Sequence, residues 1–286
     1  MQIATTNNIP VRAGLYTGGI VGYCEKNSRL QMEGCTNKGD IALAYTNWSK
    51  GVSLGAYLRS SEIGGMTIPS GADDVNIHFA GGVISVNLEN QVIDNCSNTG
   101  NMSGYTGTGG VVGLNAGRVT HCSLRQNFGS AALNYIGGIA GINTGTIESC
   151  TTEQNKTISG SSNIGGIVGW NLNGGTLTDN QSLANVSASG NCAVGGIAGR
   201  NNGNLILTND NSGVSRSVSG TNASGVGGIA GINEAGGTLT VTGTSNEIDA
   251  VGNGVSVIGL QRVGGIVGVN RGTIGHTGTS TSEKYL

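Results

Sequence analysis

The sequence contains few of the residues that interrupt or crowd a regular backbone. It has only two prolines and eleven aromatic residues among 286, and charged residues make up 10% of the chain. The scarcity of proline excludes a collagen repeat. The formal net charge of -2 provides no electrostatic reason for a nucleic acid or an anionic membrane surface as a partner.

Several other signals are missing. No stretch approaches the roughly 18 consecutive apolar residues of a membrane span, so no membrane insertion is expected. The first ten residues lack the pattern of a signal peptide, so an exported protein would carry its signal outside this segment. The six cysteines form no metal-binding spacing, and no phosphate-binding glycine motif is present, so we expect no metal and no cofactor.

Glycine is abundant instead, with 54 residues, and it marks an internal repeat. The phrase Gly-Gly-Ile/Val-Ala/Val-Gly occurs seven times, with degenerate copies at 51–55 and 81–85. A second phrase, Asn-x-Gly-x-Ile/Leu/Val, follows most copies. The first glycines of the seven clear copies are Gly18, Gly109, Gly137, Gly165, Gly195, Gly227 and Gly264.

A unit of about 30 residues with three short β-prone phrases cannot bury its own apolar face, so it must stack on its neighbours. The sequence therefore predicts an all-β protein, a parallel β-helix (β-solenoid) of about nine rungs with three short strands each, most consistent with a right-handed coil. We expect a single solenoid domain over 1–286, with an irregular insertion near 56–80, as a fragment of a larger surface protein.

Strand alternation assigns faces to the repeat. The large residue of the first phrase is expected in the core, at Ile20, Val111, Ile139, Ile167, Ile197, Ile229 and Ile266. An asparagine four positions later has the same parity, which predicts a buried ladder of stacked amides. Its members are Asn115, Asn143, Asn171, Asn201, Asn233 and Asn270.

The opposite parity is unexpectedly apolar. Either the strip is an apolar docking surface or is covered by another layer, a second chain or a further domain, or a bulge or the glycine pair breaks the alternation and buries part of it. Both interpretations stay open at the level of sequence. The candidate docking strip consists of Ile136, Ala140, Ile142, Ile164, Val168, Trp170, Val194, Ala198, Arg200, Val226, Ala230 and Ile232.

Candidate catalytic groups are sparse. Cys96, Cys122 and Cys150 occupy equivalent places, which favours free buried thiols because stacked parallel strands orient them poorly for disulfides. The acidic residues are scattered, and none of the three histidines has a nearby carboxylate or cysteine arrangement that suggests a catalytic triad. We therefore expect no catalytic residue and no enzyme. The alternative, from fold analogy, is a polysaccharide lyase or glycosidase.

The units GGVVGLNAGRV, GGIAGINTGTIESC and GGIVGWNLNGGTL resemble the GLUG motif, a glycine-rich repeat of bacterial surface proteins. The resemblance covers 109–275 well, 18–36 partly and 50–105 in degenerate form. It implies an exported or cell-surface bacterial protein, because such repeats occur in adhesin-like proteins and beside the catalytic part of immunoglobulin A metallopeptidases. The chain has no His-Glu-x-x-His, so peptidase activity is not implied. We expect an adhesion or spacer module whose partners are host proteins, glycans or flanking domains.

Overall fold

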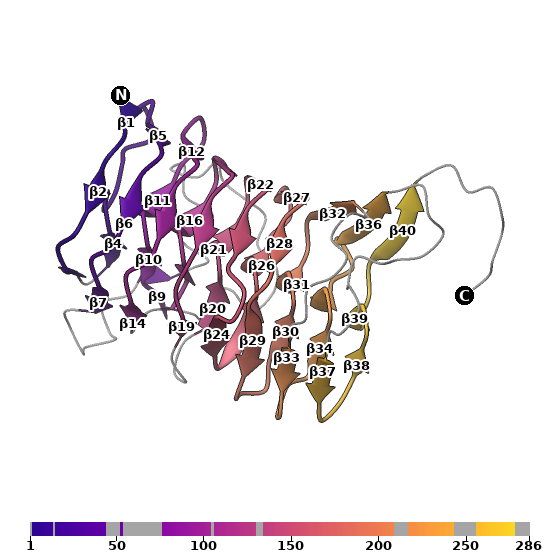
Figure 1. Ribbon diagram of the computed structural model, residues 1–286. Helices are drawn as coiled ribbons and strands as arrows, with labels where there is room; N and C mark the ends of the chain where they lie inside the picture. Colours follow the sequence, from indigo (N-terminus) through magenta and orange to yellow (C-terminus); the bar gives the residue numbers. More distant parts are fainter. Residues whose placement is uncertain are drawn as a thin grey trace.

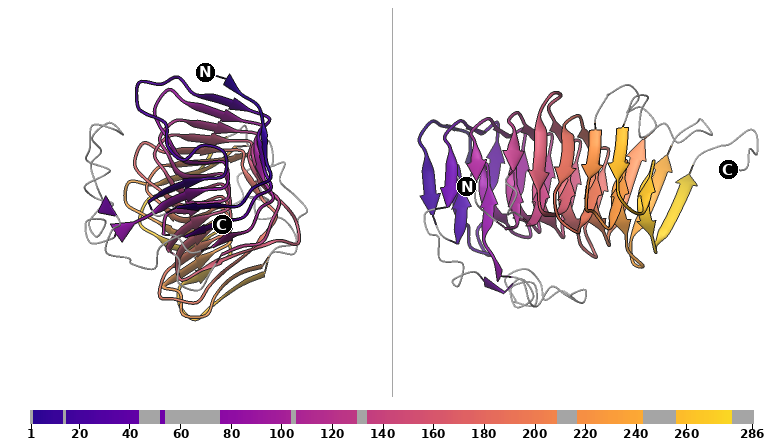
Figure 2. Two further views of the ribbon diagram at one scale, coloured as in Figure 1. Left: turned by 90° about the vertical axis from the view of Figure 1, so that its left-hand side faces the viewer. Right: turned by 90° about the horizontal axis from the view of Figure 1, so that it is seen from below.

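The computed structural model describes residues 2–13, 15–43, 52–53, 76–103, 106–129, 134–208, 217–242 and 256–277. These residues form strands and turns only, and the strands stack into parallel sheets along one axis (Figures 1 and 2). The N-terminal strands lie at one end of the stack and the C-terminal strands at the other. The predicted all-β parallel β-solenoid is confirmed.

One representative turn contains five short strands, which the chain enters in the order of the sheets named here I to V. They are β20 (Asn134–Gly137), β21 (Ala140–Asn143), β22 (Thr146–Glu148), β23 (Thr151–Thr152) and β24 (Thr157–Gly160). The three strands predicted for each unit are too few. The backbone bends at Gly138 and Ile139, which divides the first phrase, and again at Ser149 and Cys150, which divides the second.

Equivalent strands of successive turns pair in parallel. Sheet I consists of β4 (Tyr16–Gly18), β10 (Phe79–Gly81), β15 (Thr108–Gly109), β20, β25 (Ser162–Gly165), β30 (Ala193–Gly195), β34 (Gly225–Gly227) and β38 (Val263–Gly264). Sheet II consists of β11 (Ile84–Asn87), β16 (Val112–Asn115), β21, β26 (Val168–Asn171), β31 (Ala198–Asn201), β35 (Ala230–Asn233) and β39 (Val267–Asn270).

Sheet III is the longest, with nine strands. They are β1 (Gln2–Ile3), β5 (Gln31–Glu33), β12 (Val92–Asp94), β17 (Arg118–Thr120), β22, β27 (Thr176–Thr178), β32 (Asn204–Thr208), β36 (Thr238–Thr242) and β40 (Thr273–Thr277). The solenoid has about six turns in place of the predicted nine, because sheets III, I and II hold nine, eight and seven strands but sheets IV and V only six and five.

The remaining sheets are shorter. Sheet IV consists of β2 (Thr6–Asn7), β6 (Thr36–Asn37), β13 (Ser97–Asn98), β18 (Ser123–Leu124), β23 and β28 (Gln181–Ser182). Sheet V consists of β19 (Phe128–Gly129), β24, β29 (Asn185–Ala188), β33 (Ser217–Gly220) and β37 (Ser256–Gly259). A three-stranded sheet near the N-terminus consists of β3 (Val11–Ala13), β7 (Ile41–Leu43) and β14 (Met102–Ser103).

The degenerate copy at 51–55 does not form a rung of sheet I. Gly18 pairs directly with Gly81, which in turn pairs with Gly109. Within that copy, β8 (Val52–Ser53) instead pairs antiparallel with β9 (Asn76–Ile77). Most of the insertion predicted near 56–80 lies outside the described residues.

The predicted isoleucine column lies in the core. Its five central members have exposed fractions of 2% or less, and Ile20 and Ile266 at the two ends are partly buried against the same cluster. The backbone N–H of Ile139 donates to the carbonyl of Ile167 at 2.9 Å, which keeps the column in register from turn to turn. The central members are Val111, Ile139, Ile167, Ile197 and Ile229.

The asparagine ladder is confirmed and is one residue longer than predicted. In each pair, the Nδ2 amide donates to the Oδ1 of the next turn at 2.7 to 2.9 Å. Six members are fully buried, and the ladder pairs their amide groups except Asn87 Oδ1, which has no hydrogen-bond partner among the described residues. The ladder runs through Asn87, Asn115, Asn143, Asn171, Asn201, Asn233 and Asn270.

Candidate functional site

The candidate docking strip is not an exposed surface. Eleven of its twelve residues have exposed fractions of 8% or less, and Arg200 is half-buried. The interpretation as an outward-facing strip is therefore wrong, and the alternative that the glycine pair buries the set is correct. The buried members are Ile136, Ala140, Ile142, Ile164, Val168, Trp170, Val194, Ala198, Val226, Ala230 and Ile232.

The bend at the glycine pair explains this burial. Ile136, before the bend, packs in one cluster with side chains of sheets IV and V. Ala140, just after the bend, joins the cluster that contains the isoleucine column, and Ile142 joins a third cluster. A single alternation of faces cannot be continued through such a corner, so both parities become buried.

The third cluster occupies the corner between sheets I and II, and it is rich in aromatic side chains. The rings of Tyr135 and Trp170 stack with centroids 5.4 Å apart. Trp170 Nε1 donates to Asn202 Oδ1 at 2.8 Å, and the guanidinium of Arg200 lies 5.1 Å from the centre of the Trp170 ring. This corner thus buries Trp170, the one aromatic residue of the strip.

Free cysteines also stack, as predicted. All six are free, and four of them align along the corner between sheets III and IV. The backbone N–H groups of Cys35, Cys96 and Cys122 each donate to the Sγ of the next cysteine at 3.3 Å. The N–H of Cys150 donates to Asn180 Oδ1 at 2.9 Å, so an amide ends the row.

The residue before each of these positions has a left-handed backbone. Its φ lies between 48° and 65°, a conformation that glycine and asparagine tolerate best. Repetition of this conformation turns the chain sharply from sheet III into sheet IV. The residues are Gly34, Asn95, His121, Ser149 and Asp179.

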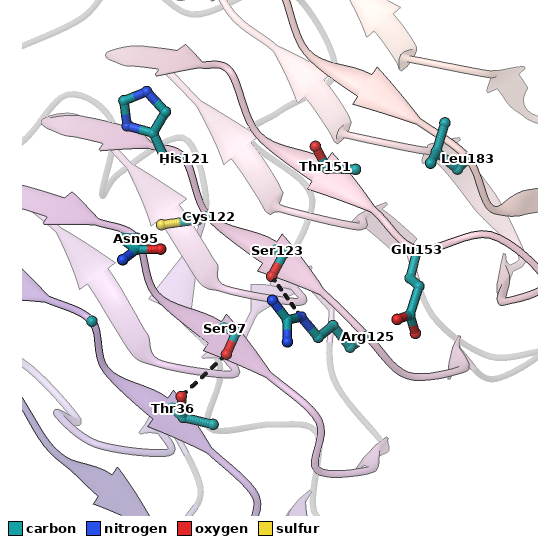
Figure 3. Close-up of a pocket in the computed structure, with 11 residues that line it drawn as sticks. Thr36, Asn95, Ser97, His121, Cys122, Ser123, Arg125, Thr151, Glu153 and Leu183 are labelled. Carbon is teal, nitrogen blue, oxygen red and sulfur yellow. Dashed lines mark hydrogen bonds between the residues drawn. The ribbon is translucent and has the colours of Figure 1, made fainter. Parts of the chain in front are cut away.

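The outer side of sheet IV carries a polar groove of about 560 Å³ (Figure 3). A row of in-register hydroxyl residues forms its floor, because alternation in these strands points Asn98, Leu124 and their equivalents inward. The groove is lined by Gly34, Thr36, Asn95, Ser97, His121, Cys122, Ser123, Arg125, Thr151, Glu153 and Leu183.

Hydrogen bonds connect parts of this floor. The hydroxyls of Thr36 and Ser97 lie 3.2 Å apart, and Arg125 Nε donates to Ser123 Oγ at 3.2 Å (Figure 3). Glu153 forms an exposed ion pair with Lys156 at 3.4 Å. The groove thus offers hydroxyls, one guanidinium and one carboxylate, which together donate and accept hydrogen bonds without a strong net charge.

His121, at the edge of the groove, is not isolated as sequence suggested. Its Nδ1 lies 2.9 Å from Asp94 Oδ1, and Thr120 Oγ1 donates to the same oxygen at 2.6 Å. The hydrogen bonds from Thr120 and His121 lower the pKa of Asp94. Asp94 is therefore an ionised acceptor that holds His121 in place, and it lacks the raised pKa of a general acid.

Among the described residues, no group of three His, Cys, Asp or Glu side chains is arranged to hold a metal ion. Nor does that part of the chain contain a helix with the length and apolar character needed to cross a membrane. Comparison with protein-family models, with curated proteins and with solved structures gives no match. The similarity to the GLUG motif therefore stays a prediction from sequence.

Proposed function

We propose that this chain is a non-catalytic repeat module of an exported bacterial surface protein, where it acts as a spacer and adheres to carbohydrate. The polar groove on sheet IV is the observation that carries the adhesive role. Its hydroxyl row extends over four successive turns, from Thr36 through Ser97 and Ser123 to Thr151. Hydroxyls repeated at the roughly 4.8 Å spacing of paired strands suit a linear ligand that also repeats polar groups, as a glycan does.

The internal ladders support the spacer role. Seven asparagines and four cysteines hydrogen-bond from turn to turn, so each turn is bonded to both neighbours along the axis as well as through its sheets. In a solenoid, stability comes from such contacts between adjacent repeats. The chain is therefore expected to behave as one stiff unit.

A carbohydrate-active enzyme is the alternative, and the groove is the place for it. Lyases and glycosidases commonly need two cooperating acid or base groups, and most glycosidases use a pair of carboxylates. Glu153 is the one carboxylate among the residues that line the groove. Asp94, at the edge of the groove, is already hydrogen-bonded to His121 and Thr120. These contacts favour binding over cleavage.

Binding to an array of glycans and host proteins tests the proposal. Ser123→Tyr places a ring in the middle of the groove, whereas Thr146→Tyr places the same ring on the outer side of sheet III as a matched control. We expect glycan binding that Ser123→Tyr abolishes and Thr146→Tyr retains. Binding that survives Ser123→Tyr would refute the groove as the adhesive face, and release of sugar from a bound polysaccharide would refute the non-catalytic role.

A further inference from the structure

Two columns of residues face each other across the corner between sheets I and II. Their contacts are direct, since Tyr135 stacks on Trp170 and a Cβ added to Gly225 would lie 3.1 Å from Ile232 Cγ1 and 3.2 Å from Val269 Cγ2. The sheet II column consists of Val86, Leu114, Ile142, Trp170, Arg200, Ile232 and Val269.

The opposing column changes in size along the axis. Tyr16, Phe79 and Tyr135 supply rings to it, with Gly107 between the last two, and the next three turns carry Asn163, Ala193 and Gly225. Gly225 is closely packed, since a Cβ there would lie 2.7 Å from the carbonyl oxygen of Gly231, but Asn163 and Ala193 leave part of the corner unfilled. A cavity of about 250 Å³ results, lined by Ser162, Asn163, Asn191, Cys192, Ala193, Arg200, Ser224, Ile232 and Arg271.

Two guanidinium groups at this cavity are held in fixed positions. Glu234 Oε1 accepts from Arg200, and Glu234 Oε2 accepts from Arg271 Nη1 at 2.8 Å. Burial of Glu234 opposes its ionisation, but the hydrogen bonds from the two arginines outweigh this effect and lower its pKa. The guanidinium of Arg200 also lies over the Trp170 ring, which limits its movement. Two cations against one carboxylate leave the pocket with a net positive charge.

We propose that this pocket binds the carboxylate of an acidic sugar residue. Arginine presents several donors in a rigid fork that matches a carboxylate, and guanidiniums already held by Glu234 and Trp170 need little reordering on binding. Ser162, Ser224 and Asn163 supply groups that pair with sugar hydroxyls, and Ile232 supplies an apolar wall.

The size of the pocket limits its ligand. Its volume lies below the roughly 300 to 1,000 Å³ of sites that hold drug-sized molecules, so it admits a single residue or a pendant group. This second site lies at a different corner from the groove on sheet IV, and the inference goes beyond the proposed function.

Calorimetric titration with trigalacturonate and with neutral galactotriose tests the inference. We expect trigalacturonate to bind at least about tenfold more tightly, with an affinity that falls as salt is added. Arg271→Gln removes one guanidinium, and Asn163→Tyr fills the cavity with the ring that Tyr135 supplies one turn earlier in the same left-handed position. Both should weaken binding at least about tenfold, and Arg118→Gln, which removes an exposed paired arginine on sheet III, should not.

Each outcome is decisive. Equal binding of the neutral sugar, or full binding by Arg271→Gln, overturns the inference. Equal binding of triaspartate overturns the assignment to a sugar. Melting temperatures of all variants check folding, and if Asn163→Tyr is destabilised, Arg271→Gln decides alone. If Ser123→Tyr abolishes trigalacturonate binding while Arg271→Gln retains it, the groove is the site, which supports the proposed function and refutes this pocket.

Discussion

The backbone N–H of Cys122 donates a hydrogen bond to the Sγ of Cys150 at 3.3 Å, although the two residues are 28 positions apart in sequence. The same contact joins Cys35 to Cys96 across 61 positions. The thiol of Cys122 in turn donates to the carbonyl of Thr120 at 3.1 Å. The sulfurs of Cys96, Cys122 and Cys150 therefore each act as acceptor and donor at once, which ties the corner of one turn to the next.

Alkaline pH should destabilise the fold through its buried thiols. Burial raises the pKa of Cys35 and of Cys192 to about 11, from an ordinary value of 9.0. A pKa raised in the folded state means that the stabilising contribution is complete below pH 9 and is lost as the pH rises toward 11. Urea unfolding from pH 8 to 11 should show a falling free energy of unfolding. A Cys35→Ala, Cys192→Ala variant should show a smaller decline, and an equal decline would contradict the assignment.

An asparagine in the interior of the ladder should contribute more to the free energy of unfolding than the asparagine at its end. Asn171→Ala removes the acceptor of Asn143 Nδ2 and the donor to Asn201 Oδ1, both buried. Each unpaired buried group costs about 1 to 3 kcal/mol, so we expect a loss of about 2 to 4 kcal/mol in the free energy of unfolding. Asn270→Ala, at the exposed end, should cost less than about 1 kcal/mol because water replaces its one ladder bond. Equal losses in urea titrations would mean that the ladder contributes little.

The second glycine of the repeated phrase should be required for stability only where another turn packs against it. A Cβ at Gly166 would lie 1.9 Å from Ser182 Oγ and 2.1 Å from the carbonyl oxygen of Gly196, whereas nothing lies within 4 Å of one at Gly265. Gly166→Ala should lower the free energy of unfolding by about 1 to 3 kcal/mol or more. Gly265→Ala, the matched substitution in the last turn, should change it by less than about 0.5 kcal/mol. Thermal unfolding of the two variants makes the comparison.

The sequence was sufficient to predict the solenoid, because identical residues recur at one register and a buried polar residue such as Asn143 must find an identical partner in the next turn. The sequence was not sufficient to predict which side chains are buried at the corners. Alternation places Ile139 and Ile142 on opposite faces, but the bend at Gly138 buries both.

The contact between Asp94 and His121 at the edge of the groove was not predicted, for a related reason. Asp94 and His121 are 27 positions apart and meet only because Asp94 pairs with Thr120 in register. The repeats in the first units are irregularly spaced, since Gln31 and Val92 pair although they are 61 positions apart. The register of Asp94 with Thr120 could therefore not be read from the sequence. A second ladder, Asn7 to Asn37 to Asn98 at 2.8 Å for each step, was missed because only three turns carry it.

Spin labels along sheet III test most directly whether like residues stack in vertical register. Gln31 and Thr176 are four pairing steps apart, and Gln31 and Thr273 are seven. At about 4.8 Å for each step, pulsed electron paramagnetic resonance should give backbone separations of about 19 Å and about 34 Å, before allowance for the label arms. Distances that fail to grow with the number of turns, as in units that close into a ring of separate blades, would contradict the account.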